Sequence, residues 1–382
     1  IDTGSPGIAG DGGFTYFVVV EATSYASGST SDGSGDYIID RTVDTNELAS
    51  LKVANTNKYG FQKRDNSGGG LGGPVTTTNI NTSAFQMVDY MRNRGSNYQV
   101  YLNSTLEGTL SDSDGDLTPA ATRIGRHQSI ASAGLKGYIS ELAIYNFGLN
   151  TAHRIIVDNY LSAKYGITIS NDRYAYDTPG TYEHYVAGIG RETISSFHQD
   201  AQGPAIVRIY SPSSLDDGDY LLWGHDNADP MYGPRFIAWT DPPAGIDNAM
   251  HRTWRVDETG EVGTVSVSFD LTGYEVESGS HLRLLVDSDD GDFENATLYP
   301  VSSYTDSIAT FENIDFSAGQ WFTIGSTDEK TILPIELLSF EGQFITNRVD
   351  LKWVTVSEHD NDYFTLERKG RNTEWVILDS IQ

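Results

Sequence analysis

Residues 141–167 read ELAIYNFGLNTAHRIIVDNYLSAKYGI, and this stretch combines a strand pattern with a single helix pattern. Apolar residues alternate at Leu142 and Ile144, which predicts a strand. Asn150, followed by a threonine, is typical of a helix start, and Gly166 fits a helix stop. The apolar residues at helical spacing between them are Ala152, Ile155, Ile156 and Leu161. One short helix after a long run of strands indicates where a β-rich domain ends.

The chain is long enough for two or three domains. It has 382 residues, of which 38% are hydrophobic and 11% aromatic, enough for real cores. The 39 glycines recur in Ser-Gly, Asp-Gly and Asn-Ser-Gly clusters. This composition is typical of many short strands joined by tight turns.

The net charge narrows the classes of partner. Lys and Arg number 25 against 53 Asp and Glu, so the formal charge is −28. Phosphate backbones and anionic membrane surfaces would be repelled, whereas divalent cations and neutral glycans remain open as partners. The alternative is that the acidity only keeps a secreted protein soluble. No apolar run approaches the roughly 20 residues of a membrane span, so we expect no membrane insertion.

The absence of cysteine excludes disulfides and thiolate metal sites.

Short strand patterns follow one another through the first 168 residues, at the spacing that a two-sheet sandwich needs. They lie at 14–24, 36–40, 58–63, 84–91, 97–102, 121–126 and 135–145.

Four of these motifs resemble the strands of LamG-type, concanavalin A-like jelly rolls in bacterial surface proteins. They are FTYFVVVE (14–21), YQVYLNSTLEGT (98–109), TRIGR (122–126) and GYISELAIY (137–145). The resemblance covers residues 1–168. It implies a jelly-roll sandwich and a secreted or cell-surface location, and it does not identify the ligand.

Residues 169–330 have a different texture, with strand patterns at 185–190, 205–210, 220–224, 262–271, 281–287 and 320–325. YVAGIGRE, LLWGHDNA, HRTWRVDETGEVG and LLVDSDDGDF are similar to an uncharacterised β domain. That domain commonly follows LamG modules in large surface proteins of the Bacteroidota. We therefore expect a second β-sandwich-like domain here, and fold-level analogy supplies little function.

Residues 331–382 change pattern again. LPIELLSFEGQ, VDLKWVTVSEHDNDYFTLERK and WVILDSIQ resemble the first strands of a fibronectin-III-like module, an Ig-like sandwich. In the family this module lies near the C-terminus of proteins exported by type IX secretion. Such a sandwich needs about 100 residues, so we expect only part of one. The predicted fold class is all-β throughout.

Two acidic turns are the candidate metal sites. The first holds Asp287, Asp289, Asp290 and Asp292 around a glycine, directly after a strand pattern. The second, inside the LamG-like region, holds Asp112, Asp114 and Asp116. Closely spaced carboxylates suit Ca²⁺, which takes six to eight oxygen ligands, although the first turn lacks the Glu that completes an EF-hand loop. The alternative for both is a solvated acidic turn.

Two aromatic residues are candidates for stacking against a ligand. Trp239 precedes a pair of prolines, which favours a loop, and Tyr232 lies nearby. Packing beneath a loop is the alternative. The other tryptophans with strand-like surroundings are expected in the core.

The sequence offers no catalytic constellation. His225 precedes an aspartate, but no G-x-S-x-G elbow or H-E-x-x-H helix accompanies it, so we expect a structural histidine. Laminarinase-like jelly rolls usually carry acidic residues in an E-x-D-x-E run, and Glu141 stands alone.

These observations leave three hypotheses about the function. The first is a non-catalytic, calcium-assisted adhesion protein that binds a glycan or another cell-surface ligand. The second is a filament-forming protein that pairs with other surface-protein chains by strand addition. The third is a polysaccharide-degrading hydrolase or lyase.

Overall fold

The structure is a computed structural model of an all-β chain. It describes residues 12–24, 35–41, 48–54, 57–64, 73–115, 121–127, 130, 133–203, 206–228, 232–233, 243–274, 276, 278–328, 337–346, 348–355, 364–368 and 376–381. The chain divides into two compact units. The first comprises residues 1–227, 253–267 and 312–321, and the second comprises residues 228–252, 268–311 and 322–382.

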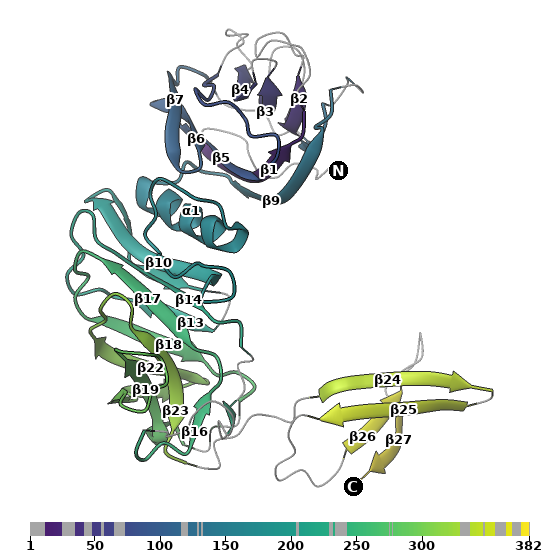
Figure 1. The fold of residues 1–382 in the computed structure, drawn as a ribbon, viewed down its shortest axis with the longest axis vertical. Helices are drawn as coiled ribbons and strands as arrows, with labels where there is room; N and C mark the ends of the chain where they lie inside the picture. The colour runs from purple at the N-terminus through teal and green to yellow at the C-terminus, as the bar shows by residue number, and fades with distance from the viewer. Residues whose placement is uncertain are drawn as a thin grey trace. The chain divides into compact units, whose positions relative to one another are not determined.

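The N-terminal part of the first unit is a sandwich of two sheets (Figure 1). The five-stranded sheet has the order β7-β6-β5-β1-β9. Its strands are β1 (Phe14–Ala22), β5 (Gln86–Asn93), β6 (Asn97–Leu102), β7 (Thr105–Ser111) and β9 (Gly137–Tyr145). The four-stranded sheet has the order β4-β3-β2-β8, formed by β2 (Asp36–Asp40), β3 (Leu48–Ala54), β4 (Lys58–Arg64) and β8 (Arg123–Ile124). Each of these neighbouring pairs is antiparallel.

Strand β1 is buried on both faces, which explains its continuous apolar sequence. Alternate residues such as Tyr16 and Val18 face the core between the two sheets, whereas Phe17 and Val19 belong to a second apolar cluster. Burying both faces needs the run FTYFVVV rather than the polar–apolar alternation of a half-exposed strand. The predicted all-β, two-sheet sandwich is confirmed.

Helix α1 (Thr151–Tyr165) begins and ends where the sequence predicts. The Asn150 side chain accepts a hydrogen bond from the His153 N–H, and Gly166 ends the helix at φ +62°. The helix carries two apolar faces. Leu161 packs with Phe17 and Val19 of the sandwich, while others pack against the next sheet. Those other residues are Ala152, Ile155 and Ala163, in a cluster with Val186, Tyr220 and Leu222.

The rest of the first unit contributes antiparallel strands to two further sheets, and the one that contains β10 lies beside α1 (Figure 1). Strand β10 (His184–Thr193) pairs with β11 (Ser196–His198) on one edge and with β14 (Tyr220–His225) on the other, and β14 pairs with β17 (Trp254–Thr259). Strand β12 (Asp200–Gln202) pairs with β13 (Val207–Tyr210), and β18 spans Val265–Asp270.

The second unit contains shorter antiparallel pairs. Strand β16 (Asn248–Met250) pairs with β15 (Tyr232–Gly233) and with β23 (Trp321–Ser326). Strand β19 (Leu282–Asp287), preceded by the short 3-10 helix Gly279–His281, pairs with β20 (Thr297–Pro300). Strand β21 (Ser303–Thr305) pairs with β22 (Ile308–Ile314).

Two hairpins lie within the region predicted as a partial fibronectin-III-like module. Strands β24 (Leu337–Ile345) and β25 (Arg348–Thr355) form one, and β26 (Phe364–Arg368) and β27 (Val376–Ile381) form the other. Several of their apolar side chains are exposed, including Phe344, Val349 and Ile377. These pairings agree with strands of an all-β module.

Candidate metal centre

The acidic turn at Asp287 connects the antiparallel strands β19 and β20. Asp287 is the last residue of β19, so its position is fixed by the strand pairing. Farther along the turn, Phe293 is buried although its φ is +66°, and Gly291 has φ +80°. A buried phenylalanine in the left-handed region indicates that core packing holds this turn in shape.

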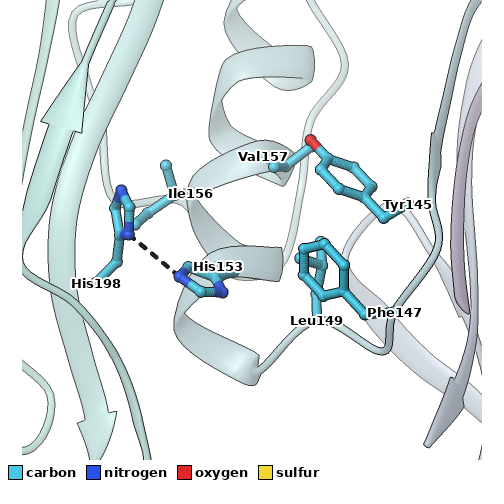
Figure 2. A pocket seen from close by; sticks show the side chains of 7 residues that line it. All are labelled: Tyr145, Phe147, Leu149, His153, Ile156, Val157 and His198. Atoms are coloured by element: carbon cyan, nitrogen blue, oxygen red, sulfur yellow. Dashed lines mark hydrogen bonds between the residues drawn. The ribbon is translucent and has the colours of Figure 1, made fainter. Parts of the chain in front are cut away.

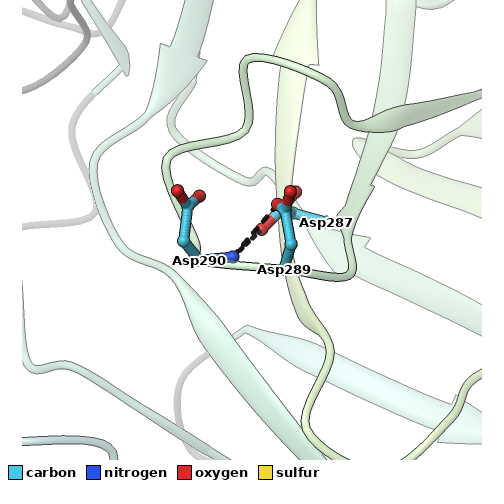
Figure 3. A group of neighbouring side chains, drawn as sticks. All are labelled: Asp287, Asp289 and Asp290. Carbon is cyan, nitrogen blue, oxygen red and sulfur yellow. Dashed lines mark hydrogen bonds between the residues drawn. The ribbon is translucent and has the colours of Figure 1, made fainter.

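Three carboxylates of this turn converge. Asp287, Asp289 and Asp290 each offer a carboxylate oxygen, and these oxygens lie within 4.8 Å of one another. Figure 3 shows the three side chains along the one turn. Because Ca²⁺–oxygen distances are about 2.3–2.6 Å, a single ion can touch oxygens with this separation. No other group of three His, Cys, Asp or Glu side chains in the described part of the chain meets this geometry.

Asp287 is the most informative of the three residues. Its side chain is fully buried, and its Oδ2 accepts hydrogen bonds from the N–H groups of Asp290 (3.2 Å) and Gly291 (2.6 Å). Its Oδ1 is buried and accepts no hydrogen bond. A buried oxygen of this kind costs about 1–3 kcal/mol unless a partner satisfies it. A bound cation would supply that partner.

The two exposed members are held by local hydrogen bonds. The Asn295 amide donates to Asp289 Oδ2 at 2.9 Å, and this bond lowers the pKa of Asp289 below its usual value. Asp289 is therefore ionised at neutral pH, as a metal ligand must be. The sequence prediction did not include Asn295, although an amide within the same turn was a usable signal.

Asp292, the fourth predicted ligand, lies outside the group of three. Its Oδ1 accepts a hydrogen bond from the Glu294 N–H at 2.9 Å. The geometry therefore gives Asp292 a turn-stabilising contact.

The predicted second site, at Asp112 and Asp114, has cationic partners instead. Asp112 accepts a hydrogen bond from Arg92 Nε at 3.0 Å, and Asp114 lies 2.5 Å from Lys63 Nζ. Burial alone would raise the pKa of Asp112, but the Arg92 bond keeps it below its usual value. Because these carboxylates are already neutralised, the geometry favours a structural role for them. Asp116 lies outside the described residues.

The two predicted aromatic contacts are only partly described. Tyr232 lies in β15, where its backbone pairs with Met250, and its side chain is outside the described residues. Trp239 is outside them altogether. Both remain predictions.

The residues weighed for catalysis have structural contacts. His225 is buried in β14, and its Nδ1 accepts a hydrogen bond from the Asn227 N–H at 2.9 Å. Glu141 accepts hydrogen bonds from Lys164 Nζ and from the Tyr165 hydroxyl, both at 2.7 Å, which join β9 to the end of α1.

Comparison with known proteins gives a family match for part of the chain. Residues 153–320 match a family described as a domain of unknown function, DUF8202. No curated protein sequence matched the chain significantly. Within the described residues, no helix is long and apolar enough to cross a membrane.

The solved structures to which this chain is similar include a CBM40 domain, a pentraxin and the binding domain of a neurotoxin. The CBM40 of Ruminococcus gnavus IT-sialidase, bound to alpha2,3 sialyllactose, is 15% identical, covers 41% of this chain and 84% of that chain, and has a TM-score of 0.32. A heptameric SAP-like pentraxin from Limulus polyphemus is 14% identical. The match covers 46% of this chain and 82% of the pentraxin chain, with a TM-score of 0.32. The binding domain of botulinum neurotoxin serotype D is 12% identical. The match covers 92% of this chain and 82% of the toxin chain, with a TM-score of 0.31. These similarities are too low to carry a functional argument.

Proposed function

We propose that this chain is a non-catalytic, extracellular cell-surface protein that binds glycans with the help of Ca²⁺. The observation that carries the proposal is the convergence of Asp287, Asp289 and Asp290, with the buried Oδ1 of Asp287 lacking a hydrogen bond. A rigid, buried carboxylate beside two exposed ones is a suitable arrangement for a cation at the protein surface.

The ligand chemistry favours Ca²⁺ among the common metal ions. The three candidate ligands are all carboxylates, which are hard oxygen donors. Ca²⁺ tolerates irregular geometry, whereas Mg²⁺ demands a near-ideal octahedron and Zn²⁺ prefers nitrogen and sulfur. The net charge of −28 further favours cation binding.

Exposure links the cation to glycan binding. Asp289 and Asp290 are exposed, so an ion that they hold with Asp287 would face solvent on one side. Three carboxylates supply fewer than the six to eight oxygens that Ca²⁺ takes when each binds through one oxygen. The remaining positions are open to water or to the hydroxyl groups of a sugar. Neutral glycans suit this surface because the acidic protein does not repel them.

A glycan array run with Ca²⁺ and with chelator tests the proposal. We expect binding to at least one glycan in Ca²⁺ and its loss with chelator and in Asp287→Asn. Asp306→Asn is the matched control, because it removes the same charge from an exposed turn outside the group of three. A silent array under both conditions would contradict glycan binding. Glycan binding that is unchanged by chelator would contradict the role of Ca²⁺. Release of oligosaccharides from a polysaccharide would show that the protein is an enzyme.

A second candidate function is assembly with other surface-protein chains. The hairpins β24–β25 and β26–β27 expose Phe344 (71%) and Ile377 (62%), a degree of apolar exposure that favours addition of further strands. Light scattering at increasing protein concentration distinguishes the candidates. Assembly through these hairpins predicts a rising mass that Phe344→Ser reduces, and constant monomer mass contradicts assembly.

A further inference from the structure

A cavity of about 270 Å³ lies where strand β9, the start of α1 and strand β11 meet. Figure 2 shows its walls: two aromatic rings and a leucine on one side, two aliphatic side chains from the helix, and two histidines on the other side. The seven lining residues are Tyr145, Phe147, Leu149, His153, Ile156, Val157 and His198. None of them belongs to the acidic turn.

We propose that this cavity binds one neutral sugar ring through the aromatic face at Phe147 and the paired imidazoles of His153 and His198. The inference rests on the proposed glycan-binding function and adds a subsite to it. Its support comes from the rings, the polar atoms, the charge and the rigidity of the walls.

The aromatic wall offers an apolar surface at the mouth. The Phe147 side chain is 49% exposed, and its ring meets the Tyr145 ring edge-on at 5.8 Å between centroids. This contact holds Phe147 on one side, and about half of the residue is accessible to solvent. The apolar C–H face of a pyranose ring can cover such a surface, which removes apolar area from water on both partners.

The histidine pair supplies the polar groups. His153 Nε2 and His198 Nδ1 are hydrogen-bonded at 3.1 Å, and Figure 2 shows this bond joining the two rings on one side of the cavity. In a neutral pair one ring donates this bond and the other accepts it. The remaining nitrogen of the donor ring is then an acceptor, and the remaining nitrogen of the other ring carries a proton. A hydroxyl group both donates and accepts, so adjacent sugar hydroxyls match this pair.

None of the seven described lining residues is Lys, Arg, Asp or Glu, which favours an uncharged ligand. An anionic sugar would lose hydration without meeting a cation, and a wholly apolar ligand would leave the imidazole nitrogens without partners. The size fits one ring, because pockets for larger ligands are about 300–1,000 Å³.

Long-range hydrogen bonds hold the walls in place. The hydroxyl of Thr15 in β1 donates to the Phe147 carbonyl and accepts from the Leu149 N–H, both at 3.0 Å. On the other side, the Ala152 N–H donates to the Ser196 hydroxyl at 3.0 Å. Because the cavity is already formed, ordering its side chains costs little free energy when a ligand binds.

The test uses the full chain in Ca²⁺ and measures binding of D-glucose, D-galactose, D-mannose, N-acetylglucosamine and sialic acid by saturation-transfer NMR and calorimetry. We expect at least one neutral sugar to bind. Phe147→Ala should weaken it about ten-fold, and His153→Gln with His198→Gln should weaken it comparably. Phe197→Ala is the matched control, because Phe197 is exposed in β11 next to His198 and does not line the cavity.

The outcomes separate this subsite from the wider function. Melting temperatures of the variants close to that of the parent protein show that the fold survives. If the parent protein binds glycans on the array and the cavity variants bind equally well, the subsite is wrong and the proposed function stands. Sialic acid binding more tightly than every neutral sugar also overturns the subsite. A chain that binds no sugar in either assay overturns both.

Discussion

At the residue scale, Asp89 in β5 is a side chain of the first unit whose burial is energetically unfavourable. It is fully buried, neither of its oxygens accepts a hydrogen bond, and the nearest cation is Arg154 Nη1 at 3.9 Å. That guanidinium already pairs with Asp158 on the same helix. Two buried carboxyl groups therefore share one cation. Burial, followed by the charge of Asp158, raises the pKa of Asp89 well above its usual value.

We predict that Asp89→Asn stabilises the protein more as the pH rises. A raised pKa means that the folded state binds more protons than the unfolded state between the two pKa values, so stability falls as pH increases through this window. Asparagine does not titrate and escapes this loss, about 1.4 kcal/mol for each unit by which the pKa is raised. Urea unfolding at pH 5 and pH 8 measures the difference. An equal effect at both pH values would contradict the prediction, and Asp306→Asn is the control.

A second residue-scale prediction concerns His153 and His198. Burial lowers the pKa of both imidazoles below 6.5, so both are neutral at pH 7. Sugar binding that uses the neutral pair should be constant above pH 7 and fall at pH values below 6.5, where the imidazoles take up protons. Calorimetric titration with the best neutral sugar across pH 5–8 measures this. A flat profile, or a fall that His153→Gln with His198→Gln also shows, would exclude the pair as its cause.

At the element scale, helix α1 was predicted with both of its ends because the signals that end a helix are local. An asparagine cap and a left-handed glycine act within a few residues, so the sequence shows them directly. Strand β3 (Leu48–Ala54) was not predicted, although Leu51 and Val53 alternate with the polar residues Ser50 and Lys52 as in a half-buried strand. In the structure both polar side chains are buried, and the Ser50 hydroxyl donates to Asp40 at 2.7 Å. That partner comes from strand pairing, which no local pattern reports.

We predict that Asn150→Ala lowers the free energy of unfolding by about 1 kcal/mol, within the usual range of 0.5–2 kcal/mol for a lost helix cap. The substitution removes the acceptor for the His153 N–H and also the amide that donates to the Phe197 carbonyl. Asn150→Asp is the matched variant, because it keeps the cap and loses only the second bond. Chemical denaturation of all three proteins measures the effect. A destabilisation by Asp as large as that by Ala would assign the loss to the Phe197 contact.

At the scale of the whole molecule, the charge of −28 and the acidic turn act together. We predict that Ca²⁺ raises the melting temperature of the unit that holds Asp287 by several degrees. A ligand at one hundred times its dissociation constant stabilises the folded state by about 2.7 kcal/mol. Differential scanning calorimetry in chelator, then with Ca²⁺ or Mg²⁺, measures the shift. Asp287→Asn should lose it and Asp306→Asn should keep it; an equal shift in all three proteins would reflect general charge screening.

The sequence by itself determined the all-β class, helix α1 with its ends, the acidic charge and the positions of the acidic turns. These follow from composition and from interactions within a few residues. Only the tertiary structure distinguished the two acidic turns. Asp112 meets Arg92 across the sheet, whereas one oxygen of Asp287 is buried without a donor. The cavity at His153 and His198 was also beyond the sequence, since its walls come from segments that meet only when the helix packs against both sheets. The physical reason is the same in both cases: the partners of a charge and the walls of a cavity are set by long-range packing.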